Sequence, residues 1–261
     1  VEIARAVPPL SADTPRPSYY TGVVRQRQLL THDVALVEIE PNRPVEFEAG
    51  QFMLVTAPGV PGGRAYSMID YERPATRLRF VIKRKPGGGF TEWLFGTEVE
   101  GSRVGLVGPL GHATFDPGIE KPLLCIAGGT GIAGILSVLS RGEQERYFDR
   151  YDARLFFGVR TARDVFLLER LRDLKRQFAE RFHVTVALSD ETPPVDLAAA
   201  YPEFVFDVGL VHQVAGRAIQ GRLNGVRVYL AGPPPMVEAS LRMLVLEAKV
   251  PPTSILYDKF S

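Results

Sequence analysis

The sequence predicts two domains: a small antiparallel β-barrel or sandwich, then an α/β domain with a doubly wound parallel sheet. Three observations support this prediction. Short strand-like segments crowd the stretch from Tyr19 to about Phe115, and from Lys121 onward apolar strands alternate with helical stretches. The length of 261 residues also suits two domains of ordinary size. We expect an arm or linker at 1–18, the barrel at 19–118 and the α/β domain at 119–261.

The barrel half consists of short segments rich in β-branched and aromatic residues, which Pro, Gly and charged turns separate. Strands at such close spacing are typical of closed antiparallel folds. One short helix is expected near Thr91, after three consecutive glycines. The expected strands are residues 19–30, 34–40, 51–57, 65–70 and 78–84.

The α/β half begins with the fully apolar segment "PLLCIA", and helical stretches alternate with the strands that follow. This alternation is the pattern of parallel βαβ units. The stretch 163–182 has the amphipathic pattern of one long helix. The expected strands are 122–127, 153–159, 183–189 and 226–232, and the expected helices are 132–142, 163–182, 211–223 and 234–250; "SILYDKF" closes the chain.

The composition argues against several kinds of function. Lys and Arg number 31 and Asp and Glu number 30, so a net charge of +1 gives no bulk attraction to nucleic acid or to acidic membranes. The single cysteine, Cys125, cannot form an internal disulfide or a four-cysteine iron–sulfur site. The four histidines lack metal-ligand spacing, so we expect no metal site. Because neither a signal peptide nor a membrane-spanning run is recognisable, we expect a cytoplasmic protein.

The segment "AGGTGIAG" follows the first strand of the α/β half. In an open parallel sheet, ligands bind outside the carboxyl ends of the strands. Gly128, Gly129 and Gly131 would let a pyrophosphate approach the backbone, and the next helix would present free N–H groups to it. A tight strand-to-helix turn without a ligand explains this segment equally well.

Two further motifs lie in the barrel half. In "RAYSMID", Arg64 can pair with a phosphate, and Tyr66 offers a flat apolar face. Because Ser67 points to the opposite side of a strand, a bulge or a strand end is needed to turn all three to one ligand. In "KPGGGFTEWL", the glycines before Thr91 make an N-capped helix start that could hold a phosphate. Taken alone, each motif is better explained by ordinary structure, an exposed strand or a hairpin loop.

The fourth motif is "YLAGPPPMVEA", in which a strand ends at Gly232 and three prolines lead into the next helix. A proline at a helix start is common. Three in a row after a buried strand would hold a fixed wall at the ligand edge of the sheet.

In their order and spacing, the four motifs resemble those of the ferredoxin–NADP reductase superfamily, and the resemblance covers Tyr19 to Ser261. Within that superfamily, "GPLG", "FGVRTARDVF" and the "YDKF" ending are similar to the NADH-dependent reductase components of bacterial aromatic-ring dioxygenases and multicomponent monooxygenases. The resemblance implies an antiparallel Greek-key β-barrel that binds FAD, followed by an α/β doubly wound parallel sheet that binds NAD.

The resemblance assigns FAD-binding roles to the strand motif. Arg64 would hold the flavin pyrophosphate, Tyr66 would pack against the flavin ring and the ribityl chain, and the Ser67 hydroxyl would lie near flavin N5. FAD is expected rather than FMN, because the FMN-using relatives carry their iron–sulfur domain after the reductase part, where this chain ends. The other implied FAD contacts are Ala65 in the same strand, Gly88, Gly89 and Thr91 at the phosphates, Ile82 and Lys83 on the adenosine side, and Phe260 over the flavin face.

The implied NAD contacts lie mainly in the two turns of the α/β half. The glycine turn would bind the dinucleotide, and the proline turn would shape the nicotinamide pocket. The expected residues are Gly128, Gly129, Thr130, Gly131, Arg160, Asp190, Gly232, Pro233, Pro234 and Met236.

Ser67, Asp258 and Ala231 are the residues that the resemblance places at the reacting rings. Asp258 matches an acidic residue near the flavin N5 edge. Ala231 departs from the family pattern, because relatives often have Cys before the glycine of "GPPPM". A small side chain leaves room for the nicotinamide ring but lacks the sulfur contact.

The charges near the strand ends favour NADH over NADPH. A 2′-phosphate needs cations near the ends of the second and third strands. Asp190 and Glu191 follow the third strand and would repel it, whereas Arg160 and Arg163 after the second strand would attract it. All four residues also fit ordinary solvated loop charges.

The expected reaction is hydride transfer from NADH to FAD, followed by release of single electrons to an acceptor. "VEIA" and the Pro-rich stretch after it resemble the end of a plant-type [2Fe–2S] domain and its linker. We therefore expect a missing N-terminal domain that carries the cluster, and an oxygenase component or a ferredoxin as the acceptor of a monomeric reductase. The alternatives are a stand-alone flavin or ferredoxin reductase, a dinucleotide-binding electron-relay subunit that does not turn over NADH, and a two-domain protein without a cofactor.

Overall fold

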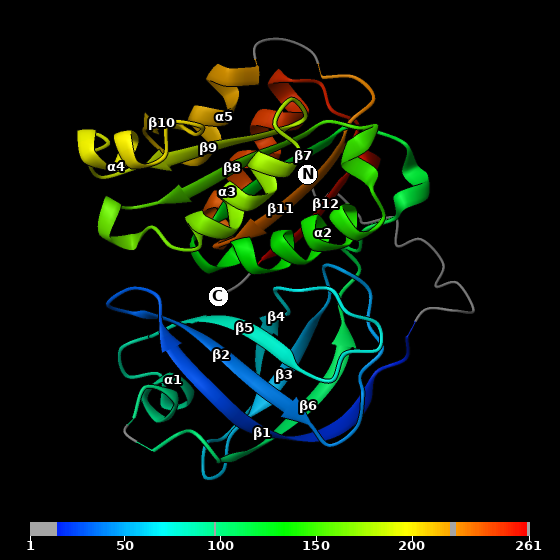
Figure 1. Ribbon diagram of the computed structural model, residues 1–261, viewed down its shortest axis with the longest axis vertical. Coiled ribbons are helices and arrows are strands. Elements are labelled where there is room, and N and C mark those ends of the chain that lie inside the picture. The colour runs from blue at the N-terminus through cyan, green and yellow to red at the C-terminus, as the bar shows by residue number, and fades with distance from the viewer. Residues whose placement is uncertain (1–14, 97, 220–222, 260–261) are drawn as a thin grey trace.

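The computed structural model describes residues 15–96, 98–219 and 223–259 and contains two six-stranded sheets. The first sheet lies below the second in Figure 1. One is antiparallel and the other parallel, which confirms the expected fold class. The predicted domain boundary, between residues 118 and 119, stays a prediction; it falls in the segment that joins the two sheets.

The barrel sheet has the strand order β4-β3-β6-β1-β2-β5, and all neighbouring strands are antiparallel. Its edge strands β4 and β5 approach each other at a bridge between Met68 and Phe80, both buried. The Ile69 amide also donates to the Arg79 carbonyl at 3.0 Å, so the sheet curls into a near-barrel. The strands are β1 (Ser18–Leu29), β2 (Val34–Pro41), β3 (Phe52–Thr56), β4 (Arg64–Ser67), β5 (Leu78–Lys83) and β6 (Arg103–Leu110).

The parallel sheet has the strand order β10-β9-β8-β7-β11-β12. The chain starts in the middle at β7, moves outward to β10 and then returns to the other side of β7. The neighbouring strands β7 and β11 are therefore the point at which the strand order reverses. The strands are β7 (Leu123–Gly128), β8 (Ala153–Val159), β9 (Phe182–Leu188), β10 (Val205–Val208), β11 (Arg227–Gly232) and β12 (Ile255–Lys259).

Helices connect these strands, and one short helix follows β5 in the barrel half. In the α/β domain, α2 lies on the side that faces the barrel (Figure 1). No helix in the described part of the chain combines the length and the apolar character that a bilayer span needs. The helices are α1 (Gly89–Leu94), α2 (Ile132–Gln144), α3 (Leu168–Gln177), α4 (Val195–Ala200), α5 (Val211–Ile219) and α6 (Pro234–Arg242).

Three details differ from the sequence-based expectations. Strand β10 and helix α4 were not expected; they have only four and six residues, which is too short to show a clear period, and no residue of either is buried. The long helix expected over 163–182 was wrong in its first part, because Leu167 has left-handed backbone (φ 60°) and α3 starts only after it. The last expected helix leaves the α-helical geometry at Met243–Glu247, which form a π-helical turn.

Candidate functional site

The glycine turn lies at the carboxyl end of β7, as the sequence predicts. Gly128 ends the strand, and Gly129–Gly131 form a 3-10 turn that leads directly into α2. Gly129 has a φ of +53°, and a methyl group added there would meet no atom within 4 Å. The turn therefore needs glycine for its backbone and leaves open space beside it.

The proline turn lies next to the glycine turn because β7 and β11 pair directly, with Ala127 opposite Ala231. A methyl group added to Gly131 would lie 2.3 Å from the Ala231 carbonyl oxygen, so the two backbones are in close contact. One added to Gly128 would lie 3.0 Å from Met236 and 3.2 Å from Pro233. The expected dinucleotide residues of both turns are thus brought together at the strand-order reversal, where ligands of such sheets bind.

The remaining residues of the two turns differ in exposure. Thr130 and Pro234 are half-buried, whereas Gly232 is buried and lies in the strand end itself. Gly232 has a φ of +153°, and a methyl group there would lie 2.4 Å from Met236 Cε. Met236 therefore packs closely against two glycines.

Strand β4 presents the Arg-x-Tyr-Ser motif. Arg64 and Ala65 are exposed, and Tyr66 is half-buried, with its ring centroid 5.5 Å from that of Phe90 in α1. Burial raises the pKa of the Tyr66 phenol above its usual range, so the hydroxyl stays protonated and uncharged. Ser67 is the last residue of β4, which is the strand end that the sequence argument required.

Ser67 is buried, with an exposed fraction of 5%, and its hydroxyl has no hydrogen-bond partner among the described residues. A buried hydroxyl without a partner is unfavourable, so such a group in a native protein points to a missing partner. A methyl group on Gly134 of α2 would lie 3.4 Å from Ser67 Oγ. The hydroxyl thus faces the α/β domain.

A small cavity lies at this junction and brings together all three residues expected at the reacting rings. Ser67 reaches it from the barrel, whereas Ala231 and Asp258 reach it from the paired strands β11 and β12. Gly50 and Gly134 also line it, and sequence reasoning missed both. A glycine inside a helical pattern, as at 134, is a sequence signal that could have indicated the close approach of α2 to Ser67.

The glycines before α1 form the second expected phosphate site. Gly88 is the residue before the helix and Gly89 its first residue; both precede Thr91, and no side chain caps the helix. Gly88 at the N-cap position agrees with the expected glycine start of the helix. The Thr91 hydroxyl accepts a hydrogen bond from the Lys85 amide at 3.0 Å and lies within hydrogen-bond distance of the Lys85 carbonyl, so it fixes the loop before the helix.

The residues expected on the adenosine side point in different directions. Ile82 is 1% exposed and belongs to the barrel core, so only its backbone could meet a ligand. Lys83 is exposed and its Nζ lies 3.1 Å from Asp33 Oδ2. Phe260 lies outside the described residues.

The two opposing charges at the expected ribose site pair with each other. Arg160 Nε donates to Asp190 Oδ2 at 2.8 Å, and the Ser189 hydroxyl donates to the other carboxylate oxygen at 2.6 Å. These two hydrogen bonds hold the pKa of Asp190 below its usual value. The carboxylate therefore stays charged and neutralises Arg160.

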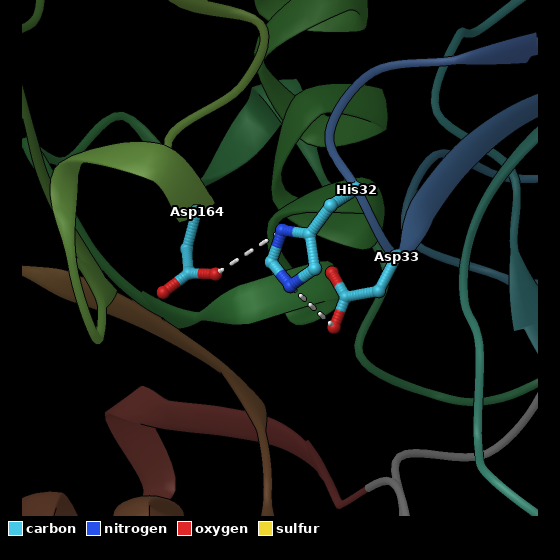
Figure 2. Close-up of side chains that lie close together, drawn as sticks. All are labelled: His32, Asp33 and Asp164. Carbon is cyan, nitrogen blue, oxygen red and sulfur yellow. Dashed lines mark ion pairs between the residues drawn. The ribbon is translucent and has the colours of Figure 1, made fainter.

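One group of side chains in the described ranges meets the distance requirement for a metal ion. The potential ligand atoms of His32, Asp33 and Asp164 lie within 4.8 Å of one another. Figure 2 shows the two carboxylates on opposite sides of the imidazole, 3.6 Å from Nε2 and 4.0 Å from Nδ1. Asp164 Oδ2 accepts two hydrogen bonds from Thr161, and its Oδ1 faces Nδ1 of the imidazole. The group fits a polar link between the domains, which the sequence spacing could not reveal.

The residues present fit the two expected cofactors. The unpartnered Ser67 hydroxyl suits a polar ring edge, and the open space beside Gly129 suits a backbone-bound pyrophosphate. The individual roles of the site residues stay predictions.

Two family models match the chain. Residues 21–115 match the model described as oxidoreductase FAD-binding domain, and residues 125–242 match the oxidoreductase NAD-binding domain. The first match covers most of the barrel half, and the second covers most of the parallel sheet and its helices.

Curated relatives are similar over most of the chain. A ferredoxin–NAD(P)+ reductase of Metapseudomonas resinovorans is 37% identical over 88% of the chain and 66% of its own length. The reductase component of propane 2-monooxygenase from Mycolicibacterium goodii is 34% identical over 88% and 64%. The ferredoxin–NAD(P)+ reductase component of the naphthalene 1,2-dioxygenase/salicylate 5-hydroxylase systems of a Ralstonia species is 34% identical over 92% and 68%. The chain thus spans about two thirds of the length of these relatives.

Solved structures of similar sequence have the same two-domain fold. The ferredoxin reductase of carbazole 1,9a-dioxygenase superposes with a TM-score of 0.81 at 33% identity, over 94% of this chain and 69% of that one. An Amycolatopsis cytochrome P450 reductase superposes with a TM-score of 0.82 at 28% identity, over 96% and 73%. The chain therefore belongs to the ferredoxin–NADP reductase superfamily, and it is an oxidoreductase with an FAD-binding and an NAD-binding domain.

Proposed function

We propose that the chain transfers a hydride from NADH to FAD and then passes single electrons, through a [2Fe–2S] centre or a ferredoxin, to an oxygenase component. The relatives that share most of its length are reductase components of monooxygenase and dioxygenase systems. The observation that carries the proposal is the cavity in which Ser67 of the FAD-binding domain faces Ala231 and Asp258 of the NAD-binding domain.

The chain's own residues would bind and orient the two cofactors. The buried Ser67 hydroxyl would donate to the flavin ring near N5, and Tyr66 would cover the ring with its apolar face. The exposed guanidinium of Arg64 would pair with the pyrophosphate. Bound FAD supplies the step that accepts a hydride and releases electrons singly.

On the other side of the cavity, the chain would position the nicotinamide. Ala231 is 4% exposed, and its methyl group would obstruct the ring less than a larger side chain at this position. The glycine and proline turns would hold the dinucleotide between them. Direct contact between the rings requires both cofactors to reach this one junction.

We further propose NADH as the reductant. Asp190 pairs with Arg160 and carries a negative charge that would repel a 2′-phosphate, whereas the exposed Arg163 remains as a cation after the second strand. The carboxylate could accept hydrogen bonds from ribose hydroxyls instead.

Anaerobic mixing of the FAD-loaded protein with NADH tests the proposal. We expect rapid loss of the flavin absorption band with NADH and a much slower loss with NADPH. An unchanged spectrum with both would refute the reductase and support the electron-relay subunit instead.

A second measurement distinguishes a protein acceptor from free flavin as the acceptor of the electrons. A ferredoxin or an oxygenase component should be reduced faster than free flavin by the NADH-reduced protein. If free flavin is reduced fastest, the chain is a stand-alone flavin reductase. Sedimentation of the same sample would test the expected monomer.

A further inference from the structure

Two helices of the NAD-binding domain hold the segment that follows Ser67. Arg170 in α3 donates to the Ile69 carbonyl at 3.0 Å, and its guanidinium lies 2.7 Å from the Asp70 carboxylate. Ser137 in α2 donates to the Asp70 carbonyl at 3.1 Å and accepts from the Gly50 amide at 3.3 Å. Two neighbouring residues of the barrel are thus bound by two elements of the other domain.

These contacts are sheltered from solvent. Ser137 is fully buried, and the side chains of Arg170 and Asp70 are exposed by only 25% and 28%. Arg79 holds the second carboxylate oxygen of Asp70 at 2.6 Å, so the carboxylate has one arginine from each domain. Hydrogen bonds between charged groups in partly buried positions are stronger than those on an open surface.

The position of this clamp relates it directly to the cavity. Asp70 follows Ser67 by three residues, and Ser137 follows Gly134, which approaches the Ser67 hydroxyl, by three residues on one face of α2. Helix α2 begins at the glycine turn. The clamp therefore connects the strand end with Ser67 to the helix that starts at the glycine turn, where the dinucleotide is expected to bind.

We propose that Arg170 is a positioning residue for hydride transfer, because it fixes Ile69 and Asp70 and thereby holds Ser67 against the nicotinamide side of the cavity. This inference rests on the proposed function. Arg170 itself touches neither cavity nor cofactor site among the described residues. A displacement of about 1 Å between reacting groups can cost on the order of a hundredfold in rate.

The test compares the FAD-loaded variants Arg170→Met and Arg170→Lys with Arg176→Met, which removes an exposed arginine from the same helix. We expect Arg170→Met to lower the limiting rate of flavin reduction by at least roughly tenfold, while the Kd for NADH changes less than about twofold. Lysine keeps the charge but not the planar fork, so Arg170→Lys should recover the rate in part. Arg176→Met should match the unmodified protein.

A second readout does not depend on activity. Amide hydrogen exchange in the peptide that covers Tyr66–Tyr71 should become about tenfold faster in FAD-loaded Arg170→Met, and should not change in the control. If Arg170→Met does not retain FAD, Arg170→Gln replaces it in both measurements. Unchanged exchange, or an equal loss of rate in Arg176→Met, would overturn the inference. If NADH fails to reduce the unmodified protein, the proposed function fails instead, and exchange alone then decides whether Arg170 orders the segment.

Discussion

The buried hydroxyl of Ser67 allows a prediction in which stability and activity change in opposite directions. Ser67→Ala removes a hydroxyl that has no partner in the described structure, whereas Ser137→Ala removes one that bonds the Asp70 carbonyl and the Gly50 amide. Both serines are buried at the same junction, so each variant serves as the control for the other. The expected difference comes from their hydrogen bonds alone.

The magnitude follows from the cost of an unpaired buried polar group, about 1–3 kcal/mol. Part of this gain is offset by the small void that alanine leaves, so FAD-free Ser67→Ala should be more stable by about 1 kcal/mol. For a protein of this size that is an increase of about 2–4 °C in Tm. Ser137→Ala should lower Tm by a similar or larger amount, because it loses two hydrogen bonds of about 0.5–1.5 kcal/mol each.

The assay is thermal unfolding followed by circular dichroism, first without FAD and then with it. With FAD bound, the gain of Ser67→Ala should disappear, because the hydroxyl then has a partner, and flavin reduction by NADH should slow. A drop in Tm of FAD-free Ser67→Ala as large as that of Ser137→Ala would refute the reasoning.

Three further outcomes are expected. Gly131→Ala places a methyl group 2.3 Å from the Ala231 carbonyl oxygen; this overpacking costs about 1–3 kcal/mol and outweighs the better helix propensity, so an unchanged or higher Tm would contradict the close contact. Asp190→Ala frees Arg160 and should raise the ratio of NADPH to NADH kcat/KM several-fold, and a constant ratio in steady-state kinetics would show that the pair does not select the cofactor. Burial raises the pKa of Cys125 to about 12, so a thiol reagent at pH 8 should label it only after urea unfolding; rapid labelling of the folded protein would contradict its burial.

Much of the fold could be predicted because its signals are local. The apolar run that became β7 and the alternation of strands and helices after it follow directly from hydrophobic pattern. Strand β10 and helix α4 have only four and six residues, so a period of about 2.0 or 3.6 could not be distinguished in them. The start of α3 was misplaced for another reason. The side-chain pattern extends back to Arg163, but the left-handed backbone of Leu167 prevents the helix from beginning before Leu168.

The motifs of the site could be found in the sequence, but their proximity in the folded protein could not be predicted from it. Ser67 and Ala231 lie far apart along the chain and reach one cavity only because two domains pack together. The partners Arg170 and Asp70 are ordinary charged residues with no distinctive neighbours in the sequence. Contacts between domains depend on the relative placement of whole elements, which local pattern does not encode.

The direct pairing of β7 with β11 has a consequence for how the chain could be altered. Everything from α2 to β10 and α5 leaves the middle of the sheet and comes back to the strand beside its starting point. A few extra residues at the exposed Pro202, between α4 and β10, would lengthen this detour without moving either end of it. The far edge of the sheet is therefore the natural place to insert a label or a second protein, at a distance from the glycine and proline turns.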